Sequence, residues 1–470
     1  MRERYHGPMS ESPRQQLPRA FPSLIETLIN LFSRPLNAAW DRGFRFLFIF
    51  DFFALYLSLV AINLIRFGQH WPTYALEHHL IGFSLVSIFL LLINYFAGLY
   101  ERESRLGNSP WLPRVSLALA VGVATIAVIT LFTDRYFMPR VNLVLLLLLG
   151  SLALTSSRYL TRILTSRRQG PARVGIVGPQ EGIQTACSQF ETNEKFGQVV
   201  ATTLDTSNII DVVRSHFITD LLFLDIQTFD TAYPEPLGEL EELGIVLHQR
   251  VSAQETLLGL RSIHQIAGMP FTRLRSHNLA NHQRRLKRLF DLLLLLTVSP
   301  IVIPIVIFFF IYVRIVAGSA ILYQQQRVGE KGETFTVFKF RTMKLDAEAD
   351  GPQIATLADP RIISSMSWMR SMRADEIPQL WNVIKGEMSL VGPRPERPEM
   401  AKGFQQEVPG YQRRTQLPPG LTGLAQVHGR YDSAAEHKLG YDLQYLVNWS
   451  LILDIQILLR TIWVVLSRRV

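Results

Sequence analysis

The chain of 470 residues contains a single cysteine, Cys187. One cysteine excludes an intrachain disulfide and a cysteine-rich zinc site, and it is consistent with a reducing, cytoplasmic setting. Lysine is absent before Lys195, so every earlier cation is arginine or histidine. The net charge of +9 comes without a nucleic-acid recognition motif, so we expect no nucleic-acid partner. The N-terminal segment also lacks the apolar core and cleavage site of a signal peptide, and we expect residues 1–42 to form a disordered cytoplasmic tail.

The basic residues cluster beside long apolar runs, a pattern typical of proteins that meet anionic lipid headgroups. A helix needs roughly 20 apolar residues to cross a bilayer, with about 17 as the lower limit. Four segments meet this requirement, at residues 46–65, 80–99, 115–132 and 141–157. We therefore predict a bundle of four transmembrane helices within residues 43–165. Burial of these helices inside a soluble protein is the alternative.

Arginines in the connecting segments predict the orientation of this bundle. They are frequent before the first span, after the second and after the fourth: Arg34, Arg42, Arg45, Arg102, Arg105, Arg114, Arg158, Arg162, Arg167, Arg168 and Arg173. The other two loops hold only Arg66, Arg135 and Arg140. Because arginine-rich loops stay in the cytoplasm, both chain ends are expected there.

A fifth apolar segment, residues 289–316, differs from the first four. Basic residues flank it on both sides, and Ser299, Pro300 and Pro304 lie near its middle. A proline inside a helix removes a backbone hydrogen bond and bends the helix. We predict a re-entrant membrane helix over residues 284–318 that breaks at Ser299-Pro300, with the freed carbonyl satisfied by the serine or by packed protein. A kinked full span, which would place the later residues outside the cell, is the alternative.

Two further segments complete this outline. Residues 449–465 mix apolar residues with Asp454, Gln456 and Arg460, which predicts an amphipathic interfacial helix or, alternatively, a buried helix. Residues 170–272 alternate short apolar runs with helical stretches, which predicts a Rossmann-like α/β domain.

The expected strands of this middle domain are residues 173–178, 220–225 and 244–248. Gln180 stands where a dinucleotide fingerprint needs its second glycine. We therefore favour a structural, dimerising or regulatory role over cofactor binding.

The adjacent carboxylates Asp375 and Glu376 are the strongest candidates for chemistry. We predict that Asp375 is the N-cap of a helix with Glu376 and Pro378 in its first turn. A helix N-terminus favours an ionised carboxylate, and a carboxylate can attack phosphorus. A solvated helix start is the alternative for this pair. Arg394, fixed between two prolines, suits bidentate phosphate recognition.

Four other cations are candidates for phosphate binding. Arg370 precedes Asp375 by five residues, and Arg361 lies in an Asp-Pro-Arg turn. Lys339 and Arg341 share one face if their segment is a strand, although a surface ion pair would also explain them.

These features belong to a longer series of motifs. The motifs lie at residues 284–291, 299–300, 326–329, 338–343, 359–362, 375–376, 386–395 and 419–423. In this order and spacing they strongly resemble the bacterial sugar transferase family, the monotopic phosphoglycosyl transferases. With four preceding spans and an α/β middle domain, the whole chain is similar to the large form, the undecaprenyl-phosphate galactose phosphotransferase type. The resemblance implies a mainly α catalytic domain at residues 319–470, carried by the re-entrant helix and by interfacial amphipathic helices.

The resemblance also implies a reaction. Asp375 would attack the phosphate that bears the sugar of a UDP-hexose, galactose or glucose, and release UMP. Undecaprenyl phosphate would then take the sugar 1-phosphate from Asp375, as the first step of O-antigen, capsule or exopolysaccharide synthesis. Glu376 would hold Mg²⁺, and Lys339, Arg341, Arg361, Arg370 and Arg394 would bind the substrate phosphates or the nucleotide. The implied setting is the cytoplasmic face of the bacterial inner membrane, among its lipids, as a homodimer.

Three local sequences depart from the family pattern. Arg373 and Ala374 replace Ser-Leu before the acidic pair, Ile377 replaces Leu after it, and residues 317–320 lack the usual Ser-Pro-Gly-Pro. None of these changes removes a proposed catalytic group, but the transferred hexose stays open. A catalytically idle membrane scaffold and a glycosyltransferase that releases UDP are the alternative functions.

Overall fold

The computed structural model describes residues 47–71, 76–100, 106, 111–133, 140–192, 197–252, 263–274, 279–345, 347, 359–428 and 434–466. The chain divides into two compact units. The first contains the residues up to 91 together with residues 126–170, and the second contains residues 92–125 together with the residues from 171 onward. The predicted N-terminal tail, residues 1–42, lies outside the described residues.

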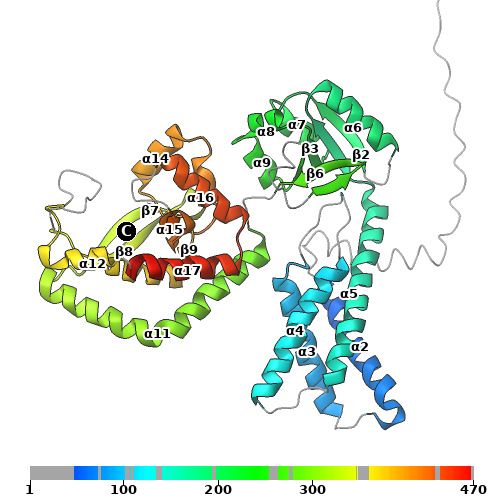
Figure 1. Ribbon diagram of the computed structural model, residues 1–470, viewed down its shortest axis with the longest axis horizontal. Coiled ribbons are helices and arrows are strands. Elements are labelled where there is room, and N and C mark those ends of the chain that lie inside the picture. The colour runs from blue at the N-terminus through cyan, green and yellow to red at the C-terminus, as the bar shows by residue number, and fades with distance from the viewer. Residues whose placement is uncertain are drawn as a thin grey trace, which may run out of the picture. The chain divides into compact units, whose positions relative to one another are not determined.

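The N-terminal half contains four long apolar helices: α2 (Leu47–Phe67), α3 (Leu76–Phe96), α4 (Trp111–Thr133) and α5 (Arg140–Gln169) (Figure 1). A short 3-10 helix, η1 (Gly68–His70), follows α2. By length and composition α2, α4 and α5 can each cross a membrane, whereas the apolar part of α3, Leu80–Phe96, is shorter. The four predicted apolar spans are thus confirmed as helices.

Buried polar contacts join α2 to α5. Arg158 donates from its two terminal nitrogens to Asp51, over 3.2 and 2.7 Å, and both side chains are almost fully buried. Asn142 donates to Asn63 over 3.1 Å and accepts a hydrogen bond from Arg66. A charge inside a bilayer is expensive unless it is paired, so these contacts fix how the two helices face each other.

The middle domain alternates strands with helices. Its elements are β1 (Arg173–Val177), α6 (Gln180–Thr192), β2 (Gln198–Thr203), α7 (Ile209–Ser215), β3 (Asp220–Phe223), α8 (Ile226–Ala232), α9 (Leu237–Glu242), β4 (Val246–Arg250), β5 (Ile263–Ile266) and β6 (Met269–Arg273). The sheet order is β2-β1-β3-β4-β6-β5, parallel from β2 to β4 and antiparallel beyond. The three strands expected from the sequence are all present.

The turn after β1 packs against the side chain of Leu224. A Cβ placed on Gly178 would lie 2.8 Å from the Cβ of Leu224, a buried residue at the end of β3. Gly178 has φ 151° and packs tightly against the end of β3, so a larger side chain does not fit at this turn.

Helix α11 (Asn281–Ala317) runs continuously through Pro300 and Pro304. It is bowed, so that its two ends approach the same side of the C-terminal domain (Figure 1). Pro300 cannot donate to the carbonyl of Leu296, and the hydroxyl of Ser299 donates to that oxygen instead, over 2.7 Å. The predicted break at Ser299-Pro300 is therefore wrong, because the helix bends without ending, whereas the predicted role of Ser299 in satisfying the freed carbonyl is confirmed. By length and composition α11 is also able to cross a membrane.

The rest of the C-terminal domain is built from short elements. They are β7 (Leu322–Val328), η3 (Glu330–Gly332), β8 (Thr334–Phe340), η4 (Ser364–Met366), α12 (Ser367–Ser371), η5 (Ala374–Gln379), α13 (Leu380–Lys385), β9 (Ser389–Val391), α14 (Pro398–Glu407), η6 (Tyr411–Gln416), β10 (Gly420–Thr422), α15 (Leu424–His428), α16 (Ala435–Val447) and α17 (Leu451–Leu466). Strands β7 and β8 form an antiparallel hairpin, and β9 and β10 pair in parallel.

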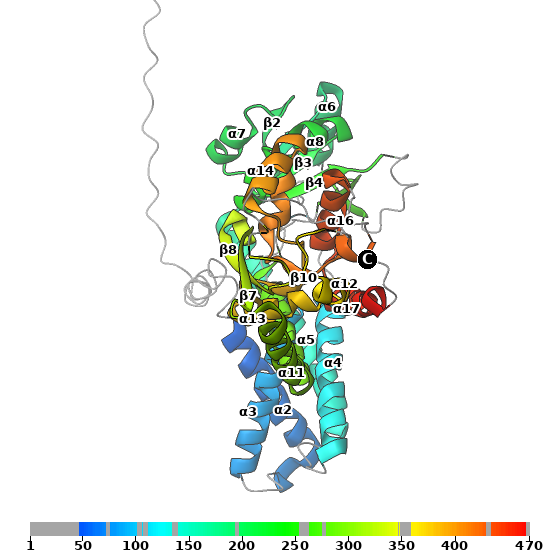
Figure 2. The same ribbon diagram turned by 90° about the vertical axis from the view of Figure 1, so that its left-hand side faces the viewer.

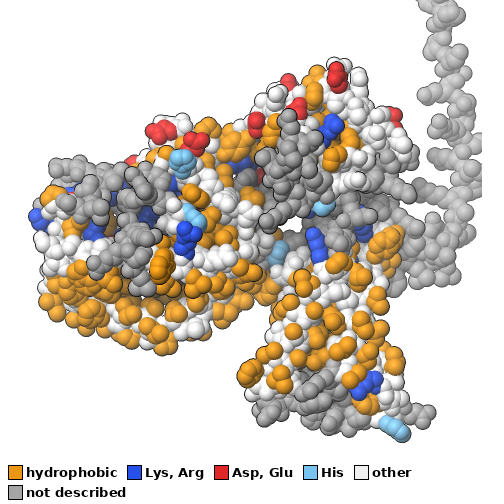
Figure 3. Space-filling model, viewed as in Figure 1, with side chains coloured by type: hydrophobic (Ala, Val, Ile, Leu, Met, Phe, Trp, Pro, Cys, Tyr) orange, Lys and Arg blue, Asp and Glu red, His pale blue; other side chains and the backbone are white. Residues whose placement is uncertain are grey.

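Helix α17 turns its acidic residue inward. Asp454 is fully buried and accepts from Lys287 of α11 over 2.9 Å, from Tyr445 over 2.7 Å and from Trp449 over 3.2 Å. The exposed side of α17 carries the apolar residues Ile452, Ile455, Leu459, Ile462 and Trp463, together with the polar residues Gln456 and Arg460. Both helices lie on the same side of the domain (Figures 1 and 2), where hydrophobic side chains gather (Figure 3).

Candidate active site

The acidic pair lies in η5, between α12 and α13. Arg373 has a left-handed backbone with φ 54° and occupies the N-cap position, and η5 begins at Ala374. The predicted N-cap at Asp375 is therefore wrong: Asp375 and Glu376 both lie inside the first turn. The cause is the sharp turn at Arg373, which ends the preceding helix and leaves both carboxylates buried.

Three cations converge on Glu376. Lys339 Nζ lies 2.8 Å and Arg394 Nη2 2.9 Å from Oε1, while Arg373 Nη1 lies 3.7 Å from Oε2. Burial opposes ionisation of Glu376, but Arg394, Lys339 and Arg373 outweigh it and hold its pKa well below the usual range. Glu376 is thus an ionised carboxylate that binds three positively charged side chains.

Asp375 has the opposite character. Within the described part of the chain it forms no ion pair, although it is only 8% exposed. Burial and the neighbouring charge of Glu376 raise its pKa to about 6, against the opposing effect of Lys339 and Arg370. Two adjacent carboxylates with separated pKa values are typical of sites in which each has its own role.

Arg394 reaches this site from a loop between β9 and α14. The loop backbone packs so closely that a Cβ on Gly420 would lie 2.0 Å from the amide nitrogen of Gly392. Gly420 donates its amide to the carbonyl of Pro393 over 2.9 Å, and Gly392 donates to Thr422 over 2.8 Å. Gly420 is therefore required for the packing of this loop.

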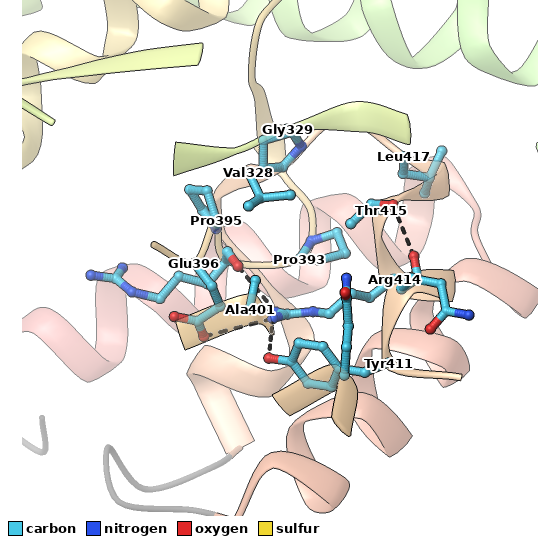
Figure 4. Close-up of a pocket in the computed structure, with 14 residues that line it drawn as sticks. Val328, Gly329, Pro393, Pro395, Glu396, Ala401, Tyr411, Arg414, Thr415 and Leu417 are labelled. Atoms are coloured by element: carbon cyan, nitrogen blue, oxygen red, sulfur yellow. Dashed lines mark hydrogen bonds and ion pairs between the residues drawn. The ribbon is translucent and has the colours of Figure 1, made fainter. Parts of the chain in front are cut away.

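Two arginines, the half-buried Arg327 and the buried Arg414, hold the back of the same loop. Arg327 Nη1 donates to the carbonyl of Pro395 over 3.0 Å, and Arg414 Nη2 donates to the carbonyl of Arg394 over 3.0 Å. Figure 4 shows Arg414 beneath Pro393 and Pro395, beside a cavity of about 20 Å³. That volume fits about one water molecule and is too small for a nucleobase.

The other predicted phosphate ligands divide into two groups. Lys339 and Arg394 are in the cluster, and Arg370 lies beside it, donating to Thr342 over 3.4 Å and acting electrostatically on Asp375. Arg341 instead donates to the carbonyls of Ala317 and Ala320 at the C-terminal end of α11. Arg361 forms a bidentate pair with Asp359, at 2.9 and 2.6 Å.

Sequence reasoning gave no role to Arg373, Arg327 or Arg414. Arg373 was noted only as a neighbour of the acidic pair and as a departure from the family pattern. A signal for Arg414 was present, because Arg413-Arg414 precedes the Pro-Pro-Gly turn, but consecutive charges usually mark a solvated surface. Both arginines of this pair are buried.

Comparisons with known proteins identify the family of the C-terminal part of the chain. The profile of the bacterial sugar transferase family matches residues 282–468. A putative undecaprenyl-phosphate N-acetylgalactosaminyl 1-phosphate transferase of Bacillus subtilis is 41% identical over 129 residues, 27% of this chain and 72% of the relative. The chain belongs to the bacterial sugar transferase family. The predicted resemblance is confirmed.

Longer members of the bacterial sugar transferase family are also similar. A UDP-galactose-lipid carrier transferase of Erwinia amylovora is 40% identical over 210 residues, 41% of this chain and 43% of the relative. An undecaprenyl-phosphate glucose phosphotransferase of Komagataeibacter xylinus is 29% identical over 327 residues, 65% of this chain and 61% of the relative. The matches thus cover less than two thirds of these longer relatives, and the names of the three relatives include three different sugars.

Proposed function

We propose that the protein transfers hexose 1-phosphate from a UDP-hexose to undecaprenyl phosphate and releases UMP, through a covalent intermediate on Asp375. The observation that carries this proposal is the unequal environment of the acidic pair. Glu376 attracts the cations, and Asp375 is buried with no ion pair to any residue that the structure describes. The pKa of Asp375 is raised to about 6, so its carboxylate is ionised at neutral pH. Because it is not held in one of these ion pairs, it is available to attack phosphorus.

The charge of the site suits a diphosphate. Lys339, Arg370, Arg373 and Arg394 supply four positive charges against the two carboxylates, which leaves an excess of two (4 − 2). Fixed cations aimed at a reacting phosphate stabilise the charge that develops in the transition state. They also remove the repulsion that a carboxylate would otherwise meet on approaching a diphosphate.

The reaction then has two displacements at one phosphorus. A carboxylate oxygen of Asp375 bonds to the phosphorus that bears the sugar, and the bond from that phosphorus to the oxygen of UMP breaks. An oxygen of undecaprenyl phosphate next attacks the same phosphorus, and the Asp375 carboxylate leaves with its electron pair. Splitting one displacement into two lets water-soluble donor and lipid acceptor use the site in turn.

The donor set around Glu376 also fits Mg²⁺. Oε1 accepts hydrogen bonds from Lys339 and Arg394, whereas Oε2 accepts none from the described residues and has Arg373 at 3.7 Å. Mg²⁺ is held by one or two carboxylates together with phosphate oxygens and water. We propose that Glu376 supplies the carboxylate, and that the ion neutralises charge on the diphosphate.

The apolar surface of α11 and α17 supports a position at the membrane. Within the described residues, only 6% of the most apolar 18-residue stretch of α11 is buried by the protein. We propose that α11 enters and leaves the cytoplasmic leaflet of the inner membrane as a re-entrant helix. The site then receives the nucleotide sugar from the cytoplasm and the lipid phosphate from the bilayer.

The proposed function is tested by trapping the intermediate. Full-length protein in lipid nanodiscs is incubated with a UDP-sugar labelled in the sugar, without acceptor, and the protein is separated under denaturing conditions. We expect label on the wild type and none on Asp375→Asn, with UMP released in proportion. Glu407→Gln, a control on the exposed side of α14, should behave as the wild type.

Other outcomes favour the alternatives. Release of UDP would favour a glycosyltransferase, and absence of any product across a panel of UDP-sugars would favour a scaffold. Product formation by Asp375→Asn at the wild-type rate would refute the assignment of Asp375 as the nucleophile.

A further inference from the structure

The 3-10 helix η6 (Tyr411–Gln416) lies between the active-site loop and the middle domain. Its consecutive residues Arg413 and Arg414 are 4% and 5% exposed and point to different partners. Arg414 contacts the loop that carries Arg394, and Arg413 contacts α9 of the middle domain.

Every nitrogen of Arg414 already has a partner. Nε donates to Asp442 over 2.8 Å, Nη1 donates to the hydroxyl of Tyr411, and Nη2 donates to the carbonyl of Arg394 over 3.0 Å. Nη1 also lies 3.6 Å from Glu396 and Nη2 lies 2.7 Å from Asp442, so the five N–H groups of this guanidinium are directed at protein atoms (shown in part in Figure 4). Arg414 is therefore a positioning residue: it fixes the backbone of Arg394, whose guanidinium meets Glu376.

Arg413 depends on the middle domain. Nη2 donates to Glu241 over 2.8 Å, and the guanidinium lies 5.5 Å from the centre of the Tyr233 ring. Within the described part of the chain, Nε and Nη1 have no hydrogen-bond partner. Glu241 thus supplies the anion for a buried cation, and a buried cation that loses its anion destabilises its surroundings.

A second contact supports the same junction just before η6. The hydroxyl of Tyr233 donates to the carbonyl of Pro409 over 3.3 Å. Gly410 has φ 76°, and a Cβ placed on it would lie 2.5 Å from the Tyr233 hydroxyl oxygen. Glycine is required both by the backbone angle and by the close approach of this tyrosine.

We propose that the middle domain braces the active site: Glu241 and Tyr233 hold η6, and η6 holds the Arg394 loop through Arg414. The brace rests on the proposed function, because that function assigns Arg394 to the substrate phosphates. Arg413 and Arg414 are neighbours in a helix of six residues, so a shift at one is passed to the other. The middle domain then has a role in catalysis without touching substrate.

The expected signature is weaker use of the UDP-sugar by folded protein. A displaced Arg394 binds the diphosphate less well in both ground and transition states, so KM rises more than kcat falls. Loss of the charged hydrogen bond between Glu241 and Arg413 should lower kcat/KM about tenfold. A purely structural role would reduce the amount of active protein, and hence kcat, with KM unchanged.

The test compares two glutamates of α9 in the full-length protein in nanodiscs, by UMP release against UDP-sugar concentration. Glu241→Gln should raise KM, whereas Glu239→Gln should not, because Glu239 pairs with Arg214 on the exposed surface. Arg413→Gln should match Glu241→Gln, and the double variant should be no worse than either single one, because one contact is lost in all three.

Arg394→Lys separates this inference from the function on which it rests. If Arg394→Lys turns over normally, the proposed phosphate site is wrong. If Arg394→Lys is impaired but Glu241→Gln and Arg413→Gln keep the wild-type KM, the brace alone is refuted. Additive losses in the double variant would also refute it.

Discussion

Replacing Asp375 by Asn should abolish turnover and stabilise the protein. Burial and Glu376 raise the pKa of Asp375 from 3.8 to about 6. A shift of about 2 units corresponds to about 3 kcal/mol, at 1.36 kcal/mol per unit. The folded state binds the proton more tightly than the unfolded state. The stability that the protonated form has below pH 3.8 is therefore lost as the pH rises through 6. Asn resembles the protonated form and does not incur this cost.

Thermal unfolding of purified wild type and Asp375→Asn in the same detergent, at pH 8 and pH 5, measures the effect. At pH 8 the variant should unfold several degrees higher, as expected from about 3 kcal/mol. At pH 5 the wild-type carboxyl is largely protonated when folded, and the difference should fall to roughly half. A variant less stable than the wild type at pH 8, or a difference independent of pH, would refute the unequal roles of Asp375 and Glu376.

Three further predictions follow from the same site. The rate of UMP release should fall as the pH drops below about 6, because protonation of Asp375 removes the nucleophile; a flat profile from pH 5 to 8 would contradict this. Arg394→Lys should lower kcat/KM for the UDP-sugar at least tenfold, whereas Arg341→Lys, at the end of α11, should lower the unfolding temperature and leave KM unchanged; equal KM effects would place both arginines at the substrate. EDTA should stop turnover and excess Mg²⁺ should restore it; persistence of the full rate in EDTA would remove the metal from the proposal.

The sequence predicted the elements of the site better than their local geometry. The motif series identified the acidic pair, Lys339 and Arg394, and the structure brings these four together. Lys339 and Arg341 do not share one face of a strand, because β8 ends at Phe340 and the alternation of side chains ends with it. Sequence spacing could not reveal that Arg341 turns to the free carbonyls at the end of α11.

The N-cap assignment failed for a related reason. Asp before Glu and Pro is a common helix start, and this pattern placed the N-cap at Asp375. The actual turn uses a left-handed backbone at Arg373, which few residues other than glycine adopt without strain. Backbone strain at one residue is set by the packing around it, and local sequence preferences do not encode it. The same turn brings Arg373 within 3.7 Å of Glu376.

Helix α17 points its acidic side chain into the domain and several apolar side chains outward. An acidic residue in a mainly apolar helix suggests a solvated face, yet Asp454 is the most buried residue of α17 and accepts hydrogen bonds from three donors inside the domain. A carboxylate facing lipid would have no partner, whereas inside the domain it meets Lys287 from the base of α11. The inward Asp454 and the outward Ile and Trp side chains are the arrangement expected if, as we propose, this side of the domain meets the bilayer. The ion pair with Lys287 joins α17 to α11, so the contact that buries the charge also aligns the apolar side chains of the two helices.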